Sequence, residues 1–261
     1  MWRPLLLVLA CVLAGCGGPA ATAPTTQTET LTPVPVPAES TPPGIESKRL
    51  VDGDALAAAH ERAVANRSYT VRSRFRVVDE NGTLRRLNTT RWVVAGGETY
   101  RGLQVGESSD RYPVSSAATK VDVFYTNGTS LIRIEDERVR YGRADTPGGV
   151  LEDLSAADRL RELYLAGDNW TVTPADGRYV LESRSVATGA LRQPLLVESL
   201  RGVRLRVVVT ETGRLVGWRL TYEGEFEGQK VRVRRTTTLT AVGNTSVPRP
   251  SWLGTARNAT G

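Results

Sequence analysis

Residues 69–83, YTVRSRFRVVDENGT, predict a β-strand and a turn because two kinds of side chain alternate along the segment. Small or apolar side chains occupy every second position and arginines fill the positions between them: Val71, Ser73, Phe75 and Val77 against Arg72, Arg74 and Arg76. A period of two places these sets on opposite faces of a β-strand, one buried and one wet. Asn81-Gly82 is a favoured hairpin turn, so the chain should fold back into an antiparallel partner.

Segments with the same strand pattern continue along most of the chain. They are expected at residues 84–94, 98–105, 120–126, 129–135, 137–142, 169–174, 178–186, 203–211, 214–223 and 229–241. Short turns separate several of them, namely Asn127-Gly128, Asp176-Gly177 and Thr212-Gly213. About ten strands joined by short turns predict one large antiparallel sheet with one face buried.

Two segments instead have the 3.6-residue period of a helix. Residues 54–65 repeat apolar side chains at helical spacing behind a candidate capping aspartate, Asp52 or Asp54. Residues 156–166 do the same, and Ser155 with Asp158 has the spacing of a capping box. We therefore predict an α+β domain over residues 48–261, in which two short helices cover one face of a large curved antiparallel sheet, an open half-barrel.

The first fifteen residues have the composition of an export signal. Arg3 precedes an apolar run at residues 5–13, and the tetrapeptide LAGC ends at Cys16. A run this short cannot span a hydrocarbon core, which needs about 20 residues, but it suits a signal peptide. The tetrapeptide resembles the lipobox of prokaryotic lipoproteins, which implies lipidation of Cys16. The alternative is a cleaved signal peptide that merely contains a cysteine.

The chain after the signal contains a single cysteine and begins with a segment of unusual composition. Cys11 lies inside the signal, so the mature chain would keep a cysteine only at its first position and could form no internal disulfide. Residues 16–47 are rich in Thr and Pro and hold few large apolar side chains, which is typical of a disordered tether. We expect residues 1–15 to be removed and the lipid on Cys16 to anchor the domain at the extracytoplasmic face of the cell membrane.

All seven asparagines of the chain begin an Asn-x-Ser/Thr sequon. Ser and Thr make up about one residue in six, so seven chance matches are improbable, although Asn-Gly-Thr turns alone would explain two of them. The set predicts N-glycosylation outside the membrane, and the candidates are Asn66, Asn81, Asn88, Asn127, Asn169, Asn244 and Asn258. Glycosylation of Asn88 would place Thr90 and Trp92 on the wet face of their strand unless a bulge intervenes.

The chain is basic, with 34 Lys and Arg against 28 Asp and Glu, and 31 of these cations are arginines. Rows of arginine alternate with apolar residues at positions 72/74/76, 204/206 and 232/234. One interpretation is the solvated side of a half-buried sheet. The other is a cationic surface suited to phosphate or carboxylate groups. We expect no nucleic-acid partner because the chain carries an export signal.

The residue types needed for catalysis or metal binding are scarce. His60 is the only histidine, no cysteine accompanies it in the folded part, and no phosphate-binding or dinucleotide-binding motif occurs. Glu223, Glu225 and Glu227 alternate on one strand face and keep a carboxylate-dependent hydrolase as an alternative. We predict no catalytic residue, no metal site, no cofactor and no enzymatic activity.

Several features together resemble the uncharacterised lipoproteins of haloarchaea: the lipobox, the Thr/Pro-rich tether, the leading helix, the hairpins and the closing VPRPSW of residues 247–252. The expected architecture is also similar to the lipoprotein-carrier fold of periplasmic lipoprotein chaperones and mycobacterial lipid-carrying lipoproteins. In that fold an acyl chain lies between a curved half-barrel sheet and the helices on its concave side. The resemblance implies a membrane-anchored protein that binds lipid or another apolar ligand.

The leading hypothesis is therefore non-enzymatic binding of such a ligand inside the half-barrel. The same side chains could equally form a closed core, and the candidate lining is Phe75, Phe124, Trp218 and Tyr222 with Leu160 and Leu163. The second hypothesis is a structural or interaction protein of the cell envelope. Its glycans and cationic face would then contact a surface-layer glycoprotein or an anionic polymer.

Overall fold

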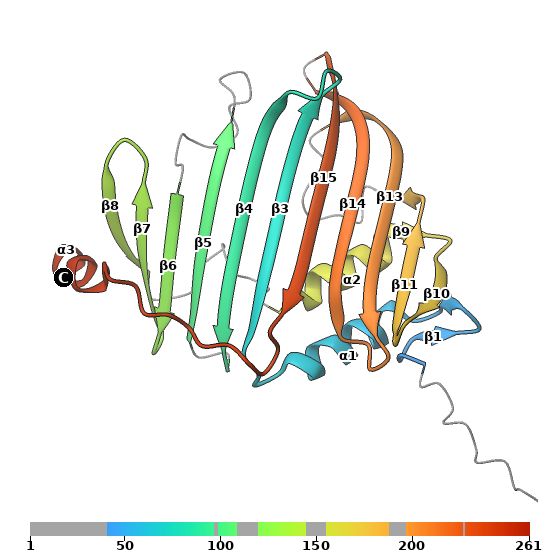
Figure 1. The fold of residues 1–261 in the computed structure, drawn as a ribbon, viewed down its shortest axis with the longest axis horizontal. Helices are drawn as coiled ribbons and strands as arrows, with labels where there is room; N and C mark the ends of the chain where they lie inside the picture. Colours follow the sequence, from blue (N-terminus) through green and yellow to red (C-terminus); the bar gives the residue numbers. More distant parts are fainter. Residues whose placement is uncertain (1–40, 97–98, 109–119, 145–154, 188–196, 227) are drawn as a thin grey trace, which may run out of the picture. The chain divides into compact units, whose positions relative to one another are not determined.

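The computed structural model describes residues 41–96, 99–108, 120–144, 155–187, 197–226 and 228–261 (Figure 1). The chain divides into two compact units, Met1–Ala38 and Glu39–Gly261, and every described residue belongs to the second. The expected signal peptide, Cys16 and most of the expected tether lie outside the described residues.

Eleven antiparallel strands form one sheet, with the spatial order β10-β11-β13-β14-β15-β3-β4-β5-β6-β7-β8 (Figure 1). In that order the strands are β10 (Thr171–Ala175), β11 (Arg178–Ser183), β13 (Glu198–Thr210), β14 (Leu215–Phe226), β15 (Gln229–Thr240), β3 (Tyr69–Asp79), β4 (Leu84–Ala95), β5 (Thr99–Ser108), β6 (Lys120–Thr126), β7 (Thr129–Glu135) and β8 (Val139–Ala144). Within the described ranges β10 and β8 are the two edges and do not pair with each other, so the sheet is open. The expected open half-barrel of the α+β class is confirmed.

Strand β15, near the C-terminus, pairs with β3 in the middle of the sheet, with Val233 opposite Val77. This pairing joins the strands that come late in the chain to those that come early. Two short ladders are formed outside the main sheet, β1 (Ile45–Glu46) with β2 (Arg49–Leu50), and β9 (Gly167–Asp168) with β12 (Ser185–Val186). Ile45 lies in the core and is only 4% exposed. The packed domain therefore includes residues expected from the sequence to belong to the tether.

The main sheet has two chemically different faces. We call the side that carries Val71, Phe75 and Val77 of β3 the inner face, and the opposite side, which carries Arg74 and Arg76, the outer face. The inner-face positions of β3 are buried or half-buried, whereas the arginines are exposed. The alternation that predicts a strand at residues 69–83 is thus the alternation between these two faces.

Helices α1 (Gly53–Val64) and α2 (Ala157–Ala166) contact each other and cover part of the inner face. Their apolar stripes, which include Leu56, Leu160 and Leu163, share a core with side chains of β10, β11, β13, β14 and β15. Figure 1 shows both helices behind this part of the sheet. The period of 3.6 therefore predicts both the helices and the stripe that each one buries.

The two helix starts differ from each other in how their free N–H groups are satisfied. At α1 the carboxylate of Asp52 accepts a hydrogen bond from the Ala55 backbone N–H at 2.8 Å, as expected. At α2 the expected capping box is wrong, because Ala156 occupies the cap position in a left-handed conformation with φ 64°. Asp158 pairs instead with the Arg161 side chain.

A third helix, α3 (Leu253–Thr260), lies on the outer face and is absent from the predictions made from sequence. Its Leu253 and Ala256 are buried against Phe124 of β6 and Leu131 of β7. The chain that leads to it crosses the ends of β3, β4 and β5 (Figure 1). None of the helices in the described ranges combines the length and apolar composition needed to cross a bilayer.

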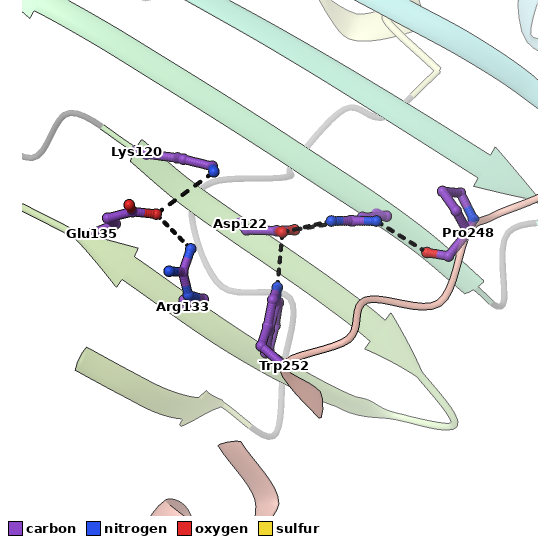
Figure 2. A network of polar contacts seen from close by, with 7 residues as sticks. Lys120, Asp122, Arg133, Glu135, Pro248 and Trp252 are labelled. Carbon is purple, nitrogen blue, oxygen red and sulfur yellow. Dashed lines mark hydrogen bonds and ion pairs between the residues drawn. The ribbon is translucent and has the colours of Figure 1, made fainter. Parts of the chain in front are cut away.

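A polar network fastens this C-terminal segment to the sheet (Figure 2). The carboxylate of Asp122 accepts hydrogen bonds from Trp252 Nε1 at 2.8 Å and from Arg101 Nε and Nη2 at 3.0 and 2.7 Å. Arg101 also donates to the Pro248 carbonyl at 3.5 Å. A second set of ion pairs lies beside it on β6 and β7: Glu135 with Arg133 and Lys120. The carboxylates of Asp122 and Glu135 are thus neutralised within the protein.

Candidate functional site

The inner face has two halves, and the helices close the first of them. Leu56, Leu160 and Leu163 of the helices are at most 1% exposed, as are Leu181 and Val207 of the sheet. All five belong to one core cluster. This half of the inner face is therefore a packed core of the kind that the closed-core alternative describes.

The second half, over β3 to β7, carries large side chains that stay half-buried around a buried tyrosine. We call this set the aromatic patch, and its members are Trp92, Tyr100, Val121, Tyr125 and Ile132. In the part of the chain that the structure describes, only one helical residue, Val64 at the end of α1, belongs to its core cluster. The helices therefore cover this half much less than the first.

Three rings of the aromatic patch pack together beside a glycine of β5. The rings of Tyr100 and Tyr125 stack with centroids 4.6 Å apart and 8° between their planes, and Trp92 meets Tyr100 edge-on at 6.2 Å. A Cβ added to Gly102 would lie 1.6 Å from the Trp92 ring. The absence of a side chain at Gly102 lets the indole lie directly on β5, which joins the three rings into one surface.

Polar and cationic side chains form a band across the sheet between the two halves. We call it the polar band, and cross-strand register places its members on β14, β15, β3 and β4: Trp218, Tyr222, Arg235, Thr237, Ser73, Phe75, Arg86 and Asn88. Two guanidinium groups lie over the Phe75 ring, that of Arg235 at 4.7 Å and that of Arg86 at 5.5 Å from its centroid. The Ser73 and Thr237 hydroxyl groups are 3.0 Å apart.

Burial governs the electrostatics of this band. Desolvation lowers the pKa of the Arg235 guanidinium, Tyr222 opposes that shift, and the neighbouring cations Arg159 and Arg86 add to it. Burial also raises the pKa of the Tyr222 phenol, against the influence of Arg235. A guanidinium remains protonated in proteins in spite of such shifts, so the band presents fixed positive charge on the inner face.

Asn88 Oδ1 and Trp218 Nε1 are buried polar atoms of the band that have no hydrogen-bond partner among the described residues. A buried polar atom left in this way costs roughly 1–3 kcal/mol, so such atoms in a folded protein call for an explanation. A bound molecule with a polar group could donate to Asn88 and accept from Trp218. The polar band and the aromatic patch together thus offer what an amphiphile needs, a polar end beside an apolar surface.

The structure brings together five of the six lining residues expected from sequence. Phe75, Trp218 and Tyr222 belong to the polar band, and Leu160 and Leu163 belong to the closed half beside it. Phe124 lies on the outer face with Leu253 and so is apart from the others. The aromatic patch was not predicted from the sequence, although the alternation of Val121, Val123 and Tyr125 indicates that these three side chains share one face of a strand.

Six of the seven sequon asparagines are exposed: Asn66, Asn81, Asn127, Asn169, Asn244 and Asn258. Asn88 differs, because it lies opposite Phe75 on the inner face. The pairing of β3 with β4 has no register shift between Asn88 and Trp92, so both share that face, and the irregularity falls at Val77/Val78 instead. The bulge that would turn Asn88 outward is therefore not formed.

His60 has a structural role. It is fully buried, its Nδ1 accepts a hydrogen bond from the Leu215 backbone N–H at 3.2 Å, and its Nε2 lies 2.5 Å from the Ser155 carbonyl, to which it donates. Both ring nitrogens are thus engaged by backbone groups, which assigns the neutral tautomer with the proton on Nε2. The ring connects α1, the start of α2 and β14.

The carboxylates proposed for a hydrolase lie on the outer face. Glu223 forms an ion pair with Arg232 at 2.9 Å, and both line a hollow of about 220 Å³ together with Glu225, Lys230 and Arg201. Asp79 and Glu80 also line this hollow, so it holds carboxylates and cations side by side, and Glu223 is the one with a described ion pair to a cation of the hollow. Glu227 lies outside the described residues, and across the described ranges no three His, Cys, Asp or Glu side chains gather as a metal site.

The fold and the inner face together define the class of protein. It is an open half-barrel of antiparallel strands, with helices over one half of its inner face and an amphiphilic surface on the other half. The chain belongs to a family of unknown function, DUF7537, whose model matches residues 3–256. No curated protein matches the sequence.

Three solved structures are similar to the chain, each covering about three quarters of it. LprF from Mycobacterium bovis is 14% identical, with 76% of this chain and 96% of that chain covered and a TM-score of 0.40. A DUF1329 family protein from Desulfovibrio piger is 11% identical, with 77% and 95% covered and a TM-score of 0.29. A domain described as an outer membrane lipoprotein-sorting protein, from Vibrio parahaemolyticus, is 8% identical, with 77% and 95% covered and a TM-score of 0.28.

Proposed function

We propose that the protein binds a lipid or a similar amphiphile on its inner face and catalyses no reaction on it. One observation carries this proposal: the aromatic patch adjoins a band in which Asn88 Oδ1 and Trp218 Nε1 are buried without partners among the described residues. Contiguous apolar surface that a protein leaves incompletely covered commonly marks an interaction site. An amphiphile would cover the patch and satisfy the polar atoms at once.

The apolar chain of the ligand would lie along the stacked Tyr100 and Tyr125 rings and the Trp92 indole. Each methylene group that leaves water contributes about 0.8 kcal/mol, so a chain of ordinary length supplies most of the affinity. The polar end would lie at Arg235 and Arg86, since guanidinium groups form strong hydrogen bonds with phosphate and carboxylate oxygens. The closed half of the core would keep the ligand on β3 to β7.

The proposal includes a location at the extracytoplasmic face of the cell membrane. The LAGC motif supports a lipid on Cys16, and two buried acyl chains hold a protein stably where one does not. The tether would then run from Cys16 to the start of the packed domain near residue 41, and these roughly 25 residues in an extended polyproline conformation reach at most about 80 Å. This reach would let the inner face meet amphiphiles at the membrane surface.

Lipid extraction from the purified full-length protein, followed by mass spectrometry, tests the proposal. We expect wild type to carry a stoichiometric amphiphile and Tyr125→Ser to lose most of it, because removing one stacked ring weakens binding by roughly tenfold. The matched control is Tyr141→Ser, since Tyr141 lies on the outer face beside Trp252 and α3. Wild type without lipid, or equal lipid in the two variants when both remain folded by circular dichroism, contradicts the proposal.

A further inference from the structure

The outer face carries a second feature that the proposed lipid site does not use. Eleven exposed arginines lie on six adjacent strands, β11, β13, β14, β15, β3 and β4. Ten of them, all but Arg201, form the set that we call the arginine face: Arg178, Arg204, Arg206, Arg219, Arg232, Arg234, Arg72, Arg74, Arg76 and Arg91. Neighbouring strands lie about 4.8 Å apart, and residues two apart on one strand lie about 7 Å apart. The guanidinium groups therefore form a grid rather than a single cluster.

The grid sets like charges directly opposite each other. The register pairs Arg206 with Arg219, Arg234 with Arg76, and Arg72 with Arg91. Like charges in such positions destabilise a sheet. Three direct arginine pairs on one surface thus lower the stability of the free protein, and an anion placed between them would remove that cost.

Carboxylates of the protein neutralise little of this charge. Glu182 lies 3.7 Å from Arg206 and Glu223 lies 2.9 Å from Arg232. Among the described residues the other arginines of the arginine face form no ion pair: Arg72, Arg74, Arg76, Arg91, Arg178, Arg204, Arg219 and Arg234. Since guanidinium groups keep their charge at every physiological pH, the arginine face is strongly cationic.

Threonine hydroxyl groups lie between the arginines of the arginine face, and some of these side chains line a hollow. Thr221, Thr236 and Thr238 alternate with arginines across β14 and β15. The hollow, of about 380 Å³, is lined by Arg178, Arg206 and Arg219 together with Thr236 and Thr238, and none of the described residues that line it is acidic.

A glycine opens the hollow. An added Cβ at Gly217 would lie 2.7 Å from the Thr237 carbonyl, so a side chain does not fit at this position. The hollow therefore results from the close packing of β14 against β15 at Gly217.

We propose that the arginine face binds an anionic polysaccharide, a polymer that carries sulfate, carboxylate or phosphate groups along a hydroxylated chain. Guanidinium groups bind such anions in a bidentate manner, and the threonines offer hydrogen bonds to sugar hydroxyls. A single-stranded nucleic acid would call for exposed aromatic side chains on which its bases stack. Among the described residues, no large apolar side chain is exposed next to the arginine face. The exposed large apolar residues are Val51, Val139 and Leu165, and they lie elsewhere.

The test measures binding of full-length protein, in detergent, to immobilised dextran sulfate, with uncharged dextran as the polymer control. The variant Arg76→Gln/Arg219→Gln/Arg234→Gln removes three cations from the arginine face, and Arg49→Gln/Arg62→Gln/Arg67→Gln removes three exposed cations elsewhere. At about 0.15 M salt we expect the first variant to bind at least roughly tenfold more weakly and the second to change less than about twofold. The first variant should also melt no lower than wild type, because it relieves like-charge contacts.

Three results would overturn the proposal: no binding of wild type to dextran sulfate, equal weakening in both variants, or tighter binding of wild type to vesicles of anionic phospholipid than to the polymer. The same samples separate this inference from the lipid proposal, because the two sites lie on opposite faces. The amphiphile content of the first variant, measured by extraction, should equal that of wild type.

Discussion

At the scale of single residues, Gly102 controls the geometry of the aromatic patch. A Cβ there would lie 1.6 Å from the Trp92 ring, so Gly102→Ala forces the indole or the β5 backbone to move. Overpacking of this kind costs about 1–3 kcal/mol. We expect Gly102→Ala to lower the free energy of unfolding in urea by that amount and to weaken amphiphile binding.

Gly142→Ala is the matched control for this change. Gly142 is also a strand glycine, on β8, and an added Cβ would meet no atom of the described residues within 4 Å. Replacing a glycine where the new side chain fits is neutral or stabilises by up to about 1 kcal/mol. Equal destabilisation by the two substitutions would show that contact with Trp92 is not what selects glycine at position 102.

Asp79 contributes stability that depends on pH. Burial alone would raise its pKa, but hydrogen bonds from the Thr83 N–H at 2.8 Å and from Arg85 outweigh burial and lower the pKa below the ordinary aspartate value. The folded pKa is thus below the unfolded one, so the contribution is fully present above the ordinary value and is lost as the pH falls through the folded value.

We expect Asp79→Asn to be less stable than wild type at neutral pH, with the difference shrinking as the pH falls below about 4. Urea midpoints measured across a pH series would show it. Glu80→Gln, an exposed neighbour with the same charge change, is the control and should show no such convergence. A difference between Asp79→Asn and wild type that stays constant with pH would refute this assignment.

At the scale of elements, local sequence predicts most of the sheet. β6 (Lys120–Thr126) and β7 (Thr129–Glu135) have the expected bounds, because Asn127-Gly128 fixes the turn and the alternation fixes the faces. Bulges escape such reasoning, as at Val208/Val209, because they depend on how two strands pair. α3 escapes it as well, since only Leu253 and Ala256 bury a side chain there and their partners are distant in sequence.

The C-terminal segment should depend on one side-chain hydrogen bond. Trp252→Phe keeps an aromatic ring against Tyr141 but removes the N–H that donates to Asp122. Hydrogen bonds to charged groups contribute about 1.5–3 kcal/mol. We expect the amide hydrogens of α3 to exchange roughly ten times faster or more in this variant, as measured by mass spectrometry.

Trp170→Phe serves as the control for that experiment. The Trp170 indole also donates a hydrogen bond, to the Tyr164 carbonyl at 3.2 Å, but it packs at α2 on the inner side. Its loss should leave exchange in α3 unchanged relative to the rest of the domain. If α3 exchanges alike in both variants, the contact with Asp122 does not hold the segment in place.

At the scale of the whole domain, the glycan sites test which face is accessible. Six sequon asparagines are exposed and Asn88 faces the polar band, opposite Phe75. We expect glycopeptide mapping of the native protein to find glycans only within the exposed set, and Asn88→Gln to leave the glycan mass unchanged. A glycan on Asn88 of the folded protein would contradict the burial of the polar band.

The site was less predictable from sequence than the fold. Alternation identifies Phe75, Trp218 and Tyr222 as inner-face residues, but it cannot tell which half of that face the helices cover. The coverage of the inner face depends on where α1 and α2 dock. Only the three-dimensional structure therefore distinguishes the closed half, which contains Leu160, from the aromatic patch, which contains Tyr125.

Photo-crosslinking would locate an amphiphile bound on the inner face. A fatty acid with a photoreactive group at its chain end would be bound to the full-length protein, irradiated, and located by peptide mass spectrometry. We expect saturable labelling of the peptides that contain Trp92 and Tyr125. Labelling that does not saturate, or that falls on the peptides of the outer face around Arg74 and Arg219, would contradict binding on the inner face.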